Sequence, residues 1–125
     1  MNKIINTKNA PAPIGPYSQS ILAGNTLYVS GQIPLDPMSG DLITSSIEDE
    51  TEMVMKNLGA ILTEAGGDYT SIVKCSIFVT DLGDFAKING VYGKYFPSNP
   101  PARETVEVSR LPKDVNVEIS CVAVI

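Results

Sequence analysis

The stretch SIEDETEMVMKNLGAILTEAGG, residues 46–67, predicts one amphipathic helix whose two ends are both marked in the sequence. Ser46 is suited to an N-cap, and the acidic residues 48–50 favour the positive end of the helix dipole. Gly66 and Gly67 end the helix. Five apolar residues recur at helical spacing along one face: Val54, Leu58, Ile61, Leu62 and Ala65. We expect this apolar stripe to lie in the core and not at a ligand site.

The rest of the chain divides into shorter strand-like and helical segments. Alternating apolar residues predict strands at 3–6, 17–22, 26–32, 72–80 and 116–125, with a further strand around Arg103. A second helix is expected at 84–96, and the loop 9–16 carries three prolines. The order β-β-β-α-β-α-β-β predicts one α+β domain over residues 1–125, with a mixed sheet and both helices packed on one face.

The face of the predicted sheet that points away from the helices has no cover. Four side chains are expected on it: Ser76, Phe78, Val122 and Val124. A partly apolar sheet face without a helix over it is typical of an association surface. We therefore predict a closed homo-oligomer.

The composition fits a folded domain that binds a small molecule and not nucleic acid. The 125 residues are 43% hydrophobic, the net charge is −5, and lysine and arginine form no cluster. Nucleic-acid binding depends on neutralising phosphates, so this surplus of acid argues against it, whereas one local cation suffices for a small anion. Residues 1–6 lack the apolar run of a signal peptide, and no segment approaches the length of a membrane span. We expect a cytoplasmic protein that does not contact a membrane.

The sequence has no histidine and two cysteines. The absence of histidine removes the commonest metal ligand and the commonest general base. Cys75 and Cys121 stand far apart in apolar, strand-like runs without metal or redox spacing, so we expect core residues in a reducing cytoplasm. Chemistry must therefore rest on carboxylates, hydroxyls, backbone groups or a positioned cation, and no metal site is predicted.

The segment PSNPPARETVEV, residues 97–108, places a scarce arginine directly behind a stiff turn. Adjacent prolines remove backbone donors and favour extended geometry, and a strand-like alternation follows them. Arg103 is one of two arginines in the chain, and a guanidinium can hold a carboxylate or phosphate by two parallel hydrogen bonds. The residue alone leaves two interpretations open: an anion-binding group, or an edge-strand arginine in a surface ion pair.

Glu118 is the best candidate for a carboxylate partner of Arg103. It stands between Val117 and Ile119 in the last predicted strand, on the face expected to associate. Burial there raises the pKa of a carboxyl unless a cation such as Arg103 is close, and a carboxylate so placed can orient or deprotonate a water molecule. A solvated strand acid is the alternative.

Two further segments have features of a pocket. Ser30 and Gly31 close a predicted strand, where glycine allows a ligand to approach the backbone and an amide to bind a carboxylate oxygen. A bulge or a turn is the alternative interpretation of these two residues. Tyr17 follows the proline-rich loop, and its ring suits either a pocket wall or simple packing.

Several of these segments, in order over nearly the whole chain, resemble the RidA (YjgF-like) family of reactive imine/enamine deaminases. NAPAPIGPYSQ at 9–19 is similar to the N-terminal signature of that family, and SGQIP at 30–34 is similar to its second signature. The C-terminal signature is resembled by PAR at 101–103, TVEV at 105–108, RLPKD at 110–114 and VEI at 117–119.

The resemblance implies a chorismate-mutase-like fold in which three subunits pack their sheets into a central barrel, with clefts between the subunits. It implies cofactor-free hydrolysis of 2-imino acids and their enamine tautomers, such as 2-aminoacrylate, to 2-keto acids and ammonia. Arg103 matches the carboxylate-binding arginine of the family, and Glu118 matches the acid that handles the water. The remaining pocket positions implied by the resemblance are Tyr17, Ser30, Gly31, Asn89 and Thr105.

Three positions depart from the family pattern. Thr105 stands where many members have cysteine, which argues against regulation through a thiol but not against hydrolysis. Glu104 stands where serine or threonine is frequent, and we expect it to point to the opposite face of the strand from Arg103. Ser120 replaces an acid often seen two residues after the matched glutamate, and it is expected to alter selectivity.

Two other functions are alternatives at this point. A non-catalytic module of the same fold could bind or sense small carboxylates at the same clefts. RNA cleavage or translational inhibition has been attached to relatives, but the net charge of −5, the missing basic stripe and the missing histidine argue against it here.

Overall fold

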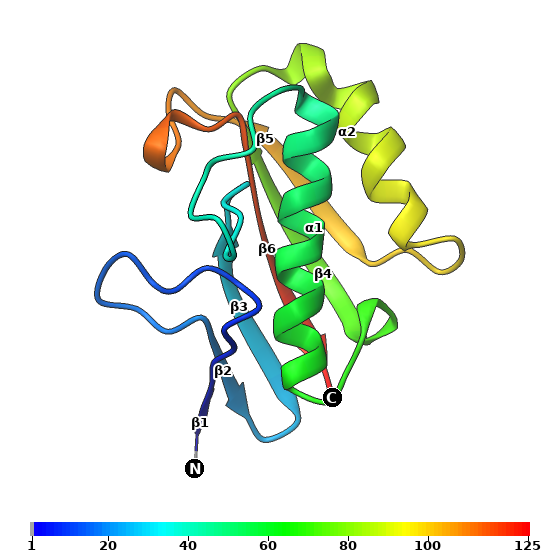
Figure 1. Ribbon diagram of the computed structural model, residues 1–125. Coiled ribbons are helices and arrows are strands. Elements are labelled where there is room, and N and C mark those ends of the chain that lie inside the picture. The colour runs from blue at the N-terminus through cyan, green and yellow to red at the C-terminus, as the bar shows by residue number, and fades with distance from the viewer. Residues whose placement is uncertain (1) are drawn as a thin grey trace.

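The computed structural model describes residues 2–125, and its centre is an open six-stranded sheet (Figure 1). The strands are β1 (Lys3–Ile5), β2 (Ser20–Ala23), β3 (Thr26–Gln32), β4 (Ile72–Val79), β5 (Ala102–Glu107) and β6 (Val117–Val124). They lie in the order β1-β2-β3-β6-β4-β5, so β5, which carries Arg103, is an edge strand. Strands β4 and β5 pair in parallel and the other neighbours pair antiparallel.

Two helices, α1 (Ile47–Glu64) and α2 (Phe85–Tyr92), cover one face of this sheet (Figure 1). The predicted mixed α+β sheet with both helices on one face is therefore confirmed. Neither helix of the described chain is long and apolar enough to cross a membrane.

Helix α1 begins and ends where the capped amphipathic stretch predicts. The hydroxyl of Ser46 accepts the Asp49 N–H at 3.0 Å, as an N-cap does. Gly66 has a φ of +90°, and the following Gly67 donates its N–H to the Leu62 carbonyl at 2.8 Å. Four residues of the predicted stripe are completely buried: Val54, Leu58, Ile61 and Leu62.

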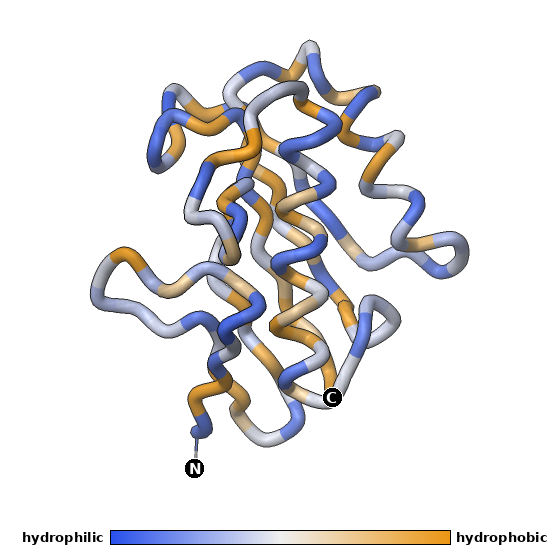
Figure 2. The backbone as a smooth tube through the Cα atoms, viewed as in Figure 1, coloured by the Kyte–Doolittle hydropathy of each residue, from blue (hydrophilic) through white to orange (hydrophobic). Residues whose placement is uncertain are grey.

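The core lies between α1, α2 and the central strands, where Figure 2 shows apolar residues recurring along β4, β6 and α1. Cys75 of β4 and Cys121 of β6 are directly opposite each other in the sheet register. Both are buried free thiols, which confirms the prediction that they are core residues. Burial raises the pKa of both thiols, so they stay protonated and unreactive at neutral pH.

Neither helix covers the opposite face of the sheet, as the sequence predicts, although at one end of it Phe78 packs on a small cluster of Ile33, Leu111 and Val115. Tyr28, Val124 and Val106 lie on it and are 52%, 44% and 40% exposed. Phe78 and Val122 lie between them and are half-buried. One chain thus presents a broad, partly apolar surface to its surroundings.

The predicted strand at 17–22 is too long at its start, because the side chain of Gln19 ties Tyr17 and its neighbours into a loop. Gln19 is 3% exposed, and its Oε1 accepts the Thr7 N–H at 2.8 Å. Its Nε2 donates to the carbonyls of Thr7, Ala10 and Pro11 at 3.0, 3.2 and 2.9 Å. Strand β2 therefore begins only at Ser20.

The predicted helix at 84–96 is also shorter in the structure. Helix α2 ends at Tyr92, and one 3-10 turn, Gly93–Tyr95, follows it. The Phe96 N–H bonds to the Gly93 carbonyl at 3.1 Å, and Pro97 then disfavours helical geometry at Phe96.

A buried carboxylate ties α1 to the start of β6. Glu50 is 1% exposed, and its two oxygens accept the backbone N–H of Asn116 at 2.9 Å and its side-chain amide at 2.6 Å. Asn116 also accepts the hydroxyl of Thr80 at 3.2 Å. Glu118 is two residues further on, so these bonds anchor the strand end that carries it.

We predict that Glu50→Gln lowers the free energy of unfolding by about 1–3 kcal/mol. The two carboxylate oxygens of Glu50 accept two N–H groups of Asn116, and a glutamine would replace one of these oxygens by an NH₂ group that faces an N–H donor at a buried position. Urea denaturation at fixed protein concentration measures the change. Glu48→Gln in the exposed part of the same helical turn is the matched control and should alter stability little. Equal stability of the two variants would contradict an anchoring role for Glu50.

Candidate active site

Four of the predicted site residues come together around one pocket between the end of β3 and the start of β6. The pocket has a volume of about 330 Å³ and is lined by Ile14, Tyr17, Ser30, Gly31, Ile33, Pro112 and Glu118. Most of these walls are apolar, and Glu118 supplies the carboxylate. The arrangement places one acid in a small cavity of low polarity.

Ser30 and Gly31 occupy a β-bulge that brings the backbone of β3 against Glu118. Between Val29 and Gln32 the register with β6 shifts, because β3 has an extra residue there. A Cβ atom on Gly31 would lie 2.7 Å from Cδ of Glu118, so a larger residue would displace the carboxyl group. The bulge interpretation is thus correct, and the bulge itself creates the close approach.

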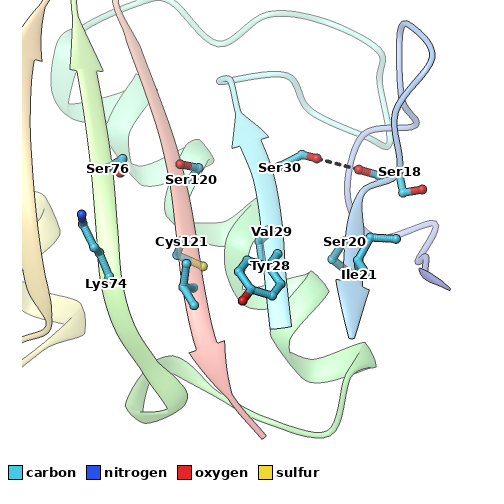
Figure 3. Close-up of a pocket in the computed structure, with 11 residues that line it drawn as sticks. Ser18, Ser20, Ile21, Tyr28, Val29, Ser30, Lys74, Ser76, Ser120 and Cys121 are labelled. Carbon is cyan, nitrogen blue, oxygen red and sulfur yellow. Dashed lines mark hydrogen bonds between the residues drawn. The ribbon is translucent and has the colours of Figure 1, made fainter. Parts of the chain in front are cut away.

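The remaining polar groups of this pocket are fixed by local hydrogen bonds. The hydroxyl of Ser30 donates to the Ser18 carbonyl at 2.6 Å (Figure 3). Tyr17 is 46% exposed, and its phenol oxygen accepts the Ile14 N–H at 3.2 Å. The Tyr17 ring therefore forms part of the pocket wall on a loop that is tied back on itself.

Glu118 is half-buried, and no cation or hydrogen-bond donor of residues 2–125 pairs with its carboxylate. Burial raises the pKa of Glu118 above the ordinary glutamate value. A carboxylate in this condition is a stronger base than a solvated one and is able to accept a proton from water.

Arg103 lies on the other side of the sheet, between β5 and α2. It pairs in register with the buried Cys75 of β4, so its side chain points to the helix-covered face. Its Nη1 donates to Oδ1 of Asn89 at 2.7 Å. Its Cζ lies 5.5 Å from the ring centre of Phe85 and 5.1 Å from that of Tyr92.

The charge of Arg103 is not neutralised within the described chain. The ion pairs of residues 2–125 are Lys74–Glu104 at 2.9 Å and Arg110–Asp114 at 2.6 Å. The alternative of a surface ion pair therefore does not hold for Arg103, whose guanidinium is half-buried and keeps donors available for an anion.

Thr105 shares the face of Arg103, and Glu104 points away from both. The hydroxyl oxygen of Thr105 is buried and has no hydrogen-bond partner among residues 2–125. Glu104 binds Lys74 and the hydroxyl of Ser76 on the open face. The expected separation of Glu104 from Arg103 is confirmed.

One chain does not bring Arg103 and Glu118 together. Glu118 pairs with Phe78, whereas Arg103 pairs with Cys75, three positions earlier in the same strand. Because successive side chains of a strand alternate between faces, the carboxylate points to the open face and the guanidinium to the helix face. The chain therefore holds two half-sites: a cation half-site (Arg103, Asn89, Thr105) and a carboxylate half-site (Glu118, Tyr17, Ser30, Gly31).

A larger hollow of about 460 Å³ lies in the middle of the open face (Figure 3). Several hydroxyl groups line it, together with the Tyr28 ring and Lys74. Lys74 is already paired with Glu104, and the Ser76 hydroxyl is bonded to the same carboxylate. This hollow thus lacks a free charged group, and it belongs to the open face of the sheet. Residues 2–125 hold no cluster of three or more histidine, cysteine, aspartate or glutamate side chains placed to bind a metal ion.

Sequence reasoning missed the residues that hold the site residues in place. Gln19 fixes the loop of Tyr17, and Glu50 with Asn116 fixes the strand of Glu118. Their partners are distant in sequence, so no local pattern marks them. The α2 residues around Arg103 did carry a signal, because positions 85, 89 and 92 fall on one helical face.

Comparisons with known proteins agree with the resemblance seen in the sequence. The sequence model described as Endoribonuclease L-PSP matches residues 7–125. A RutC family protein of Pyrococcus horikoshii is 50% identical over 98% of this chain and 98% of its own length. The human 2-iminobutanoate/2-iminopropanoate deaminase is 44% identical over 99% of this chain and 90% of its own length.

Solved structures show the same architecture. The crystal structure of RidA from the Antarctic bacterium Psychrobacter sp. superimposes with a TM-score of 0.95 at 40% identity, over 98% of this chain and 99% of that one. An identity of this size over nearly the full length shows common ancestry as well as a common fold. This chain belongs to the endoribonuclease L-PSP (YjgF/RidA) family.

Proposed function

We propose that this protein is a 2-iminobutanoate/2-iminopropanoate deaminase that hydrolyses 2-imino acids and their enamine tautomers to 2-keto acids and ammonia, without a cofactor, at sites between subunits. The observation that carries the proposal is that one chain presents an unpaired guanidinium and an unpaired carboxylate on opposite faces of its sheet. The name of the human relative supports the reaction class. We further propose that residues 1–125 form a single domain and that the protein is cytoplasmic. The two free cysteines support that location.

The two half-sites suit the two ends of such a substrate. A 2-imino acid carries a carboxylate beside an electrophilic carbon. Arg103 would bind the carboxylate through the N–H donors that its bond to Asn89 leaves free. Thr105, on the same face of β5, would line the pocket beside it. The backbone amide of Gly31 would bind a carboxylate oxygen, and Tyr17 and Ser30 would line the opposite wall. Fixing the carboxylate also fixes where water must arrive.

Glu118 would then act on the water. Its carboxylate accepts a proton as the water oxygen forms a bond to C2 of the protonated imine, which gives a carbinolamine. The amino group of that carbinolamine takes the proton back from Glu118 and leaves as ammonia. The Glu118 carboxylate accepts the proton of the C2 hydroxyl as C2–O becomes the carbonyl of the 2-keto acid, and it then passes this proton to the released ammonia or to solvent. Because the imine nitrogen is basic, little further activation is needed.

A second subunit is needed to join the half-sites. The open face carries exposed apolar side chains, among them Tyr28 and Val106, whose burial favours association. In the proposed homotrimer the three sheets pack around a central barrel. The β5 edge of one subunit, with Arg103, would then meet the Glu118 pocket of the next.

The two alternative functions have less support. The family description names an endoribonuclease, but this chain has a net charge of −5, and two of its cations, Lys74 and Arg110, are held by carboxylates. A non-catalytic module that binds small carboxylates would use the same half-sites, so turnover is the property that separates the two functions.

We predict that Arg103→Ala lowers kcat/KM for 2-iminopropanoate by about 100-fold or more, because the carboxylate loses its two-point contact. Arg103→Lys keeps the charge but not the planar fork and should recover only a small part of the activity. Keto-acid release from imine produced by an amino-acid oxidase, corrected for the reaction without enzyme, gives the rates.

Arg110→Ala removes the other arginine of the chain and is the matched control, expected to stay within about twofold of the wild type because its ion pair is exposed. Size-exclusion chromatography checks that each variant keeps its oligomeric state. Full activity in an intact Arg103→Ala oligomer would contradict the proposed function.

Glu118→Gln should lower kcat by about 100-fold or more and change the dissociation constant for 2-oxobutanoate much less. Burial raises the pKa of Glu118, so wild-type activity is present above this raised pKa and falls as the pH drops through it. In the proposed trimer the guanidinium of Arg103 from the next subunit opposes this rise, so Glu118 is ionised and active at neutral pH.

The same shift predicts the effect of the substitution on stability. Without Arg103 beside it the ionised carboxylate costs free energy in the folded state, so adding Glu118→Gln to Arg103→Ala should leave the protein at least as stable as Arg103→Ala alone near pH 7. This difference should vanish as the pH falls to where Glu118 is protonated in both states. A variant that is less stable near pH 7 would show instead that the carboxylate holds the fold together.

A further inference from the structure

One face of α2 surrounds the guanidinium of Arg103. Phe85, Asn89 and Tyr92 stand four and three positions apart, which places them on the same side of the helix. Asn89 accepts one hydrogen bond from Nη1 at 2.7 Å. The two rings lie at 5.5 and 5.1 Å from Cζ, within the range of cation–π attraction.

All three partners of Arg103 are uncharged. A carboxylate in the place of either ring would hold the guanidinium equally well but would neutralise it, as Asp114 does for Arg110. Ring faces and an amide oxygen restrain the group while its charge and most of its N–H donors remain available to a ligand. The choice of neutral partners therefore fits a cation that must bind an anion.

Burial accounts for Tyr92 but not for Phe85, although both rings contact the guanidinium. Phe85 is 42% exposed, so a large apolar ring at this position contributes little to the core. Tyr92 is 5% exposed and belongs to the core, where its hydroxyl lies beside the Cys75 thiol. The Tyr92 ring also packs on Phe96, with 4.8 Å between ring centres, whereas Phe96 makes no contact of this kind with Arg103.

We infer that Phe85 and Tyr92 are positioning residues for Arg103: their rings hold the guanidinium at the edge strand so that it meets the substrate carboxylate already oriented. An arginine side chain loses rotamer entropy when it is immobilised. We call the rings of Phe85 and Tyr92 the clamp. Because the clamp immobilises Arg103 before the substrate binds, the loss of rotamer entropy no longer weakens binding. This inference rests on the proposed function for the identity of the ligand, but the clamp itself is a property of the unliganded protein.

Phe85→Leu, Tyr92→Leu and Tyr92→Phe test the clamp, with Phe96→Leu as the matched control. Phe96→Leu removes a ring of the same cluster that contacts Tyr92 and not Arg103. Because the chain has two arginines, its ¹H–¹⁵N spectrum holds two Nε–H signals, and Arg110 serves as an internal reference. The order parameter of the Arg103 signal measures immobilisation without substrate or turnover.

We expect an ordered Arg103 Nε–H in the wild type, in Tyr92→Phe and in Phe96→Leu, and an order parameter below about 0.6 in Phe85→Leu and Tyr92→Leu. Titration with 2-oxobutanoate should show binding weakened by about 3- to 30-fold in the same two variants. KM for 2-iminopropanoate should rise by a similar factor while kcat changes less. If the two rings only supported the fold, Phe96→Leu would lower the Arg103 order parameter and the affinity for 2-oxobutanoate as much as Phe85→Leu does. Tyr92→Phe would then lower both quantities as well.

An Arg103 Nε–H that stays as ordered in Phe85→Leu as in the wild type would overturn the inference, and Phe85→Leu decides the matter even if Tyr92→Leu fails to fold. Failure of the proposed function is a separate result: Arg103 would lose order in the leucine variants, yet Arg103→Ala would retain full deaminase activity. If Arg103→Ala is inactive while Phe85→Leu keeps both Arg103 order and ligand affinity, the function stands and the clamp does not.

Discussion

The alternation of side chains along β4 and its two neighbours separates the cation of this site from its carboxylate. Arg103 follows the register of Cys75 and faces the helices, whereas Glu118 follows that of Phe78 and faces the open side. A shift of β6 by one residue against β4 would turn Glu118 to the face of Arg103, but it would also turn the completely buried Val117 and Ile119 out of the core. The hydrophobic core therefore fixes the separation of the half-sites.

Both half-sites leave a charged group without its counterpart. Glu118 is partly desolvated without a cation, and Arg103 is partly buried without an anion. Such groups cost stability in a single chain, and they persist where binding or catalysis requires them. A substrate that brings a carboxylate to Arg103 and a water to Glu118 would satisfy both. The neighbours of both groups leave their charges free for a ligand: neutral side chains surround Arg103, and the backbone of Gly31 faces Glu118.

Local sequence signals predicted the elements better than the contacts among them. The capped stripe of α1 and the alternation in β4 and β6 are periodic, and the structure follows them. The prediction that the strand begins at Tyr17 was wrong, because the side chain of Gln19 donates to three loop carbonyls. The alternation of apolar and polar residues does not reveal such a contact. Glu50 was interpreted as a helix-dipole residue, but it is buried on Asn116, 66 positions away. The clamp around Arg103 depends on the parallel β4–α2–β5 connection, a feature of topology that the strand pattern alone does not specify.

Mixing of two inactive variants tests most directly whether each site is completed between subunits. Chains with Arg103→Ala and chains with Glu118→Gln are unfolded, mixed and reassembled together, and mass spectrometry verifies that mixed oligomers form. If Arg103 of one subunit works with Glu118 of another, about a quarter of the sites in a random mixture are intact, and deaminase activity should rise to roughly that fraction of the wild type. Mixed oligomers with no more activity than the two parents would show that the two residues do not meet across a subunit boundary.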